Sequence, residues 1–118
     1  MYPSAESKAK FHRGGKALLR ALAQELRLVP GTYQVRSCKG GPAVWGEVIL
    51  HSQDIYLEVS GGSSIVHRGQ VCDVMFRRCL GLMDYSVGPN QWMESGAIIN
   101  DISAAAHHIL KTLGMVEA

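Results

Sequence analysis

The feature that most constrains the fold of this 118-residue chain is a series of three alternating segments joined by very short connections. Apolar and polar residues alternate within each segment, which is the pattern of a half-buried β-strand. The predicted strands are Thr32–Cys38, Ala43–His51 and Ile55–Ser60. A Lys-Gly-Gly-Pro turn joins the first two, and a Ser-Gln-Asp turn joins the second and third. Because parallel neighbours need a long crossover, these connections predict antiparallel pairing.

A fourth strand and two helices complete the predicted fold. The alternation returns in Gln70–Cys79. Apolar residues recur at helical spacing in Ser7–Leu28, which a proline-glycine pair terminates, and in Ile98–Leu113, where the pair Asn100-Asp101 is an alternative cap that would shorten the helix. A run of strands with helices at its ends predicts an α+β fold. We expect one domain over residues 1–118 with a disordered tail at 1–7, a four-stranded antiparallel sheet, and both helices on one sheet face.

The same alternation divides the strand side chains between the two faces of the sheet. The face turned away from the helices is predicted to be exposed to solvent and rich in aromatic residues. It is expected to carry Trp45, Glu47, His51, Tyr56 and Glu58.

The composition excludes several classes of protein. The sequence has no apolar stretch of the length that a membrane-spanning helix needs, and its polar, basic N-terminus does not resemble a signal peptide. Its three cysteines are irregularly spaced, which does not suggest a disulfide framework. We therefore expect a cytoplasmic protein with no membrane contact.

Residues that could bind a metal or catalyse a reaction do not form a recognised motif. No pair of cysteines or histidines has zinc-ligand spacing, so no metal and no cofactor are expected. Cys38 or Cys79 with His51 would provide a nucleophile and a base, but nothing in the sequence brings them together. We therefore predict no catalytic residues, and a cysteine- or histidine-dependent enzyme remains the last of three alternatives.

Basic residues gather on one side of the first predicted helix. On a helical wheel, Arg13, Lys16, Arg20 and Arg27 fall within a sector of about 60 degrees. A stripe of one sign suits a phosphate backbone or an acidic protein surface. The alternative is an ordinary solvated helix face.

Two further cations flank the turn between the first two strands. Arg36 and Lys39 lie beside a glycine pair, which would let a backbone approach an anion. The spacing is not that of a phosphate-binding Walker loop, and a simple hairpin turn is the alternative.

The segment 84–92, at the end of the longer aperiodic stretch 77–92, has the composition of a binding loop. Tyr85 and Trp92 offer large aromatic surfaces, and small polar residues separate them. The alternative is that both aromatic side chains anchor the loop on the sheet as a secondary core.

Two sequence patterns resemble a group of small, uncharacterised proteins encoded by phages and prophages of proteobacteria. Tyr33–His51 follows Y-x-V-R-S-x-K-G-G-x-A-V-x-G-E-V-x-L-H, and Asp84–Trp92 follows D-Y-x-x-G-x-N-x-W. The likeness extends from the first helix to Trp92. Where the group has C-K-G-R-K-D-Y, Cys79–Tyr85 has apolar residues at basic positions, which suggests an apolar contact or a buried role. The resemblance implies a phage setting, in which small proteins often inhibit a host machine.

These observations favour a non-enzymatic binding protein that docks on a host protein or nucleoprotein complex, such as an inhibitor of host defence of the anti-CRISPR kind. The second alternative is a module that binds nucleic acid directly. A homodimer through the C-terminal helix would cover apolar surface that one small sheet cannot bury. The expected partner-binding residues are Arg13, Lys16, Arg20, Arg27, Arg36, Lys39, Tyr85 and Trp92.

Overall fold

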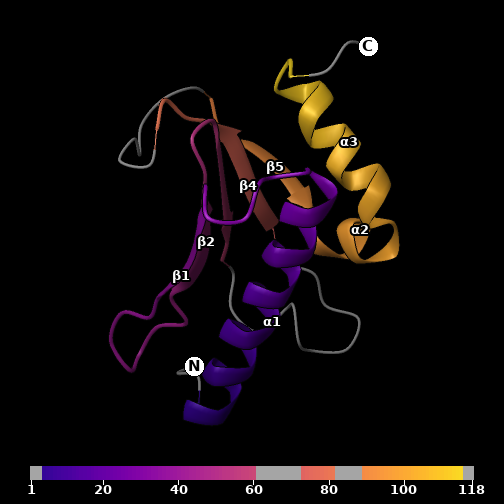
Figure 1. Cartoon of the computed structure of the whole chain (residues 1–118). Coiled ribbons are helices and arrows are strands. Elements are labelled where there is room, and N and C mark those ends of the chain that lie inside the picture. Colours follow the sequence, from indigo (N-terminus) through magenta and orange to yellow (C-terminus); the bar gives the residue numbers. More distant parts are fainter. Residues whose placement is uncertain (1–3, 61–72, 82–88, 116–118) are drawn as a thin grey trace.

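The computed structural model describes residues 4–60, 73–81 and 89–115, and within them it confirms the α+β class (Figure 1). One long helix precedes a run of strands, and two shorter helices follow them. The helices are α1 (Ala5–Glu25), α2 (Ser95–Asn100) and α3 (Ile102–Thr112). The strands are β1 (Gln34–Cys38), β2 (Glu47–His51), β3 (Ile55–Val59), β4 (Asp73–Arg78) and β5 (Gln91–Glu94).

The described strands form one antiparallel sheet in the order β1-β2-β3-β4-β5. Four strands were predicted from the sequence, whereas the described sheet has five. The missed strand is β5, whose residues were assigned to the long loop after β4. Its four residues carry no β-branched side chain and no clear signal of their own. Pairing with β4, which places Trp92 opposite Met75, makes this segment a strand.

All three helices contribute to a core on one face of the sheet, as predicted (Figure 1). Leu19 and Leu22 of α1 are buried in it together with Leu57 of β3 and Ile109 of α3. The helix α1 begins at Ala5, so residues 5 to 7 of the predicted tail belong to the helix. Ser4 caps it by accepting a hydrogen bond from the backbone N–H of Ser7.

A glycine allows α1 to pass close to the sheet. Gly15 is buried, and a Cβ atom at this position would lie 2.8 Å from a methyl carbon of Val48 in β2. The glycine pair in α1 lowers helix propensity, yet the helix continues through it. Close packing of α1 against β2 requires that the residue at position 15 has no side chain.

Trp45 lies on the opposite side from the one predicted. Gly46 has a φ of 75°, in the left-handed region, and β2 starts after it at Glu47. This reversal breaks the alternation, and the Trp45 ring packs edge-on against Phe11 of α1 with 5.9 Å between ring centroids. The alternation holds beyond Gly46, where His51 and Tyr56 pack against each other on the other face.

The predicted C-terminal helix is divided at Asp101. This residue leaves helical geometry, and its side chain accepts a hydrogen bond from the backbone N–H of Ala104, so it caps α3. Much of the apolar stripe is buried within the chain, including Ile98 and Ile109, whereas Ile99 is 62% exposed. Ile102, Leu110 and Leu113 are half-buried, so part of the apolar stripe stays accessible and the homodimer remains a prediction. No helix in the described part of the chain is long and apolar enough to cross a membrane.

Candidate functional site

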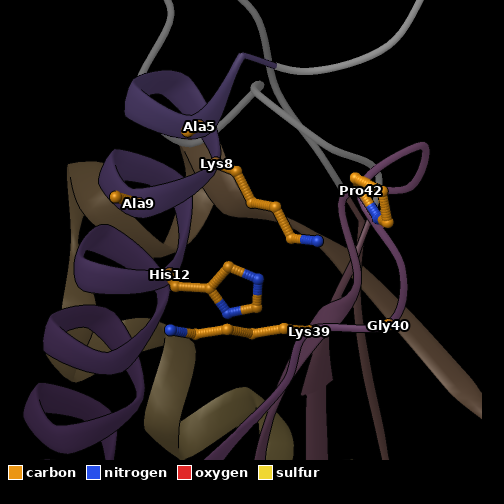
Figure 2. A pocket seen from close by; sticks show the side chains of 7 residues that line it. All are labelled: Ala5, Lys8, Ala9, His12, Lys39, Gly40 and Pro42. Carbon is orange, nitrogen blue, oxygen red and sulfur yellow. The ribbon is translucent and has the colours of Figure 1, made fainter.

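A cavity of about 370 Å³ lies between the N-terminal half of α1 and the connection from β1 to β2 (Figure 2). The helix lines one side of it and the connection lines the other. The lining residues are Ala5, Lys8, Ala9, His12, Lys39, Gly40 and Pro42.

His12 forms one wall of the cavity and joins α1 to the strands. It is only 4% exposed, its Nε2 lies 2.8 Å from the carbonyl oxygen of Trp45, and its Nδ1 lies 3.0 Å from Oγ of Ser37. Because a carbonyl only accepts hydrogen bonds, Nε2 must carry a proton and donate it. In the neutral imidazole, Nδ1 then accepts from the Ser37 hydroxyl. Both ring nitrogens are thus used in holding the cavity wall in place.

Two lysines bring positive charge to the cavity. Lys8 Nζ donates a hydrogen bond to the carbonyl oxygen of Gly41 at 2.9 Å. Lys39 Nζ has no hydrogen bond or ion pair with any residue that the structure describes. Figure 2 shows both side chains extended across the cavity. No carboxylate is among the described lining residues, so the cavity has a positive potential.

Sequence reasoning identified Lys39 but missed Lys8 and His12. Lys8 lies within the predicted helix and within α1, but it lies outside the sector of the basic stripe and was therefore not singled out. His12 precedes Arg13 of the basic stripe and follows the buried Phe11, so its position at the border between stripe and core was the available signal.

Three of the predicted basic residues share one outward side of α1. Arg13 and Arg20 are exposed and Lys16 is half-buried, and we call these three residues the basic face. None of them forms an ion pair within residues 4–60, 73–81 and 89–115. Because α1 begins earlier than predicted, Glu6 lies on the same side two turns before Arg13, where it pairs with Lys10 at 3.6 Å.

Arg27 does not extend the basic face, contrary to the wheel prediction. The helix ends at Glu25, and Arg27 follows the C-cap with a φ of 59°. This left-handed conformation reverses the chain, and it is usually occupied by glycine. Arg27 instead lines a hollow against α3, together with Glu25 and His107.

Replacing Arg27 with glycine is expected to stabilise the protein by about 1 kcal/mol, because glycine adopts the left-handed conformation without the steric cost that a side chain brings. Urea denaturation measures the change. Arg20→Gly is the control with the opposite sign, since glycine inside a helix costs about 1 kcal/mol. Equal destabilisation by both substitutions would contradict the left-handed turn at Arg27.

Arg36 and Trp92 lie away from the basic face. Arg36 faces the other side of the sheet, where its Nη1 donates a hydrogen bond to Oε1 of Gln34 at 2.9 Å. Trp92 of β5 is 55% exposed, so it does not serve as a buried anchor. Tyr85 lies outside the described residues. The partner-binding residues predicted as one group therefore belong to at least two surfaces.

The outer face of the sheet holds a cluster around Tyr56. The Tyr56 hydroxyl donates to Oε1 of Glu58 at 3.1 Å, and the guanidinium of Arg77 lies 4.4 Å from the centre of the Tyr56 ring. Burial, followed by the negative charge of Glu58, raises the pKa of Tyr56 above its usual range, so the phenol stays protonated. This cluster is suited to holding the sheet face together.

The cysteines and His51 show structural contacts. The thiol of Cys79 donates to the carbonyl oxygen of Ser52 at 3.2 Å, and Nε2 of His51 lies 2.8 Å from the carbonyl oxygen of Gly81. Cys38 is half-buried on β1. Within the described residues, no group of three His, Cys, Asp or Glu side chains is placed to hold a metal ion.

Comparison with protein-family models, with curated proteins and with solved structures found no match for this chain.

Proposed function

We propose that this protein is a non-enzymatic binding protein that docks through its basic face on an acidic surface of a host protein or nucleoprotein complex. The observation that carries the proposal is the set of three cations on one outward side of α1, without an ion pair among the described residues.

The helix that carries these cations is held firmly against the sheet. Phe11, Leu19 and Leu22 on its inner side are fully buried. Cations on a rigid element lose little backbone freedom when they bind, and a cluster of positive charges also accelerates encounter with an acidic partner. The basic face is therefore suited to recognition by charge.

Trp92 belongs to a different surface in this proposal. It is exposed on the face of β5 that it shares with Met75, whereas α1 covers the opposite face of the sheet. A flat partner that meets the basic face does not reach Trp92. In the phage setting that the sequence resemblance implies, the partner is a host nucleoprotein, such as a CRISPR effector complex.

Reversing charge on the basic face is expected to weaken partner binding by about tenfold or more while leaving thermal stability nearly unchanged. Arg20→Glu is compared with Lys111→Glu, which makes the same charge change on another exposed helix. Binding is measured by capture of partners from a bacterial lysate, and the Arg13→Glu/Arg20→Glu double variant enlarges the effect. If Arg20→Glu, Lys111→Glu and the unmodified chain captured equal amounts of partner, the proposal would be contradicted.

Direct binding of nucleic acid is the second candidate, favoured by the lack of acids among the described residues that line the adjacent cavity. A gel shift with DNA and RNA at several salt concentrations separates the two candidates. If the three cations of the basic face meet phosphates, log affinity falls by about 2.7 per unit of log salt, and the double variant loses about two thirds of that slope. If neither DNA nor RNA is retarded in the gel at low salt, direct binding of nucleic acid is excluded.

A further inference from the structure

We propose that the cavity between α1 and the β1–β2 connection binds the phosphate group of a phosphate monoester, held by Lys8 and Lys39. This site is separate from the basic face, and the proposal does not depend on docking to a macromolecule. Its volume of about 370 Å³ lies at the small end of the range for ligand pockets, which suits a compact ligand or the terminal group of a longer one.

The charge of the cavity selects the ligand class. Two ammonium groups extend into it, and its described lining holds no carboxylate. A carboxylate ligand would offset only one of the two charges. A phosphate monoester carries a charge of about −1.5 to −2 at neutral pH and therefore matches the lysine pair. The first turn of α1 lies at the same cavity, and its dipole adds potential of the same sign.

The hydrogen-bonding capacity of the lysines is also available for a ligand. The bond from Lys8 to the Gly41 carbonyl uses one of three N–H groups and fixes the direction of the side chain. Lys39 makes no hydrogen bond within the described part of the chain. Phosphate oxygens accept several charge-assisted hydrogen bonds, so they can satisfy both ammonium groups.

The wall of the cavity is held in position before any ligand arrives. His12 is bonded to Ser37 of β1 and to Trp45 just before β2, and its ring packs edge-on against Phe11. The helix side and the strand side of the cavity are therefore tied together. A site that needs no rearrangement loses less affinity to ordering.

Isothermal titration calorimetry with the full chain, in phosphate-free buffer at low salt, tests the proposal. Adenosine 5′-monophosphate and adenosine form one pair of probes. An oligonucleotide with a 5′-phosphate and the same oligonucleotide with a 5′-hydroxyl form the other. We expect each phosphorylated probe to bind more tightly than its partner. A similar affinity for the two phosphorylated probes identifies a small ligand as sufficient, whereas much tighter binding of the oligonucleotide identifies a nucleic-acid end as the source.

Variants locate the binding. Lys39→Gln and Lys8→Gln are each expected to reduce affinity for the phosphorylated probes by about tenfold to a hundredfold, as the loss of a charge-assisted hydrogen bond predicts. Lys111→Gln makes the same change in charge on α3 and should leave it unaltered. Lys39 is exposed and makes no described bond, so its variant is expected to fold even if that of Lys8 does not. Equal binding of phosphorylated and unphosphorylated probes, or equal losses in Lys39→Gln and Lys111→Gln, would overturn the proposal.

Discussion

Gly46→Ala is expected to destabilise the fold by about 3 kcal/mol or more. A Cβ atom at this position would lie 2.2 Å from the carbonyl oxygen of Cys38 and 2.8 Å from that of Lys39. Neither backbone oxygen can move away without disturbing the start of the β1–β2 pair, and the φ of 75° adds strain of its own. Overpacking against a rigid neighbour and a special backbone conformation are both causes of large losses. Chemical denaturation measures the change.

Gly41→Ala is the matched control in the same connection between β1 and β2. A Cβ atom there would meet nothing within 4 Å, so its effect should stay within about 0.5 kcal/mol. If the two variants were equally stable, the left-handed turn at Gly46 would be wrong. The described positions of Trp45 and of its carbonyl, which His12 contacts, would then be wrong as well.

Phe11→Ala is expected to cost about 3 to 5 kcal/mol, because it leaves a cavity where a fully buried aromatic ring stood. The ring contacts Trp45 edge-on and joins α1 to the strand side of the cavity that Lys8 and Lys39 line. The loss should appear as a lower midpoint in urea denaturation. Arg13→Ala, two residues further along the same helix and exposed, is expected to change stability by less than about 0.5 kcal/mol.

The Phe11→Leu variant tests whether stability depends on the buried apolar volume at position 11 or on the aromatic ring itself. Leucine keeps most of the apolar volume, so it should recover more than half of the stability that alanine loses. A Phe11→Ala variant as stable as Arg13→Ala would show that α1 does not pack on the β1–β2 connection as described.

The periodic elements could be predicted from the sequence because their signals are local. Alternation located β2 and β3, and the apolar spacing located α1, within a few residues of their ends. Short connections require antiparallel neighbours, so the pairing of β1, β2 and β3 followed as well. The segment Gln91–Glu94 lacked such a signal, and its pairing with β4 comes from tertiary contact alone.

The candidate site was predicted only in part. The basic face follows from helical spacing, which depends on neighbours three and four residues away. Arg27 left that pattern because the helix ends two residues before it. Trp45 lies on the helix side of the sheet because the left-handed conformation of Gly46 reverses the alternation. Neither the end of the helix before Arg27 nor the reversal at Gly46 has an unambiguous signal in the sequence.

The sequence by itself determined the α+β class, the antiparallel strand order of the first hairpins and the basic face, since each depends on residues close together in the chain. Only the tertiary structure decided the cavity. His12 meets Ser37 and Trp45 across 25 and 33 positions of sequence, and Lys8 reaches Gly41 across 33. Contacts over such separations arise when packing brings α1 against the sheet, and no periodicity in the chain encodes them.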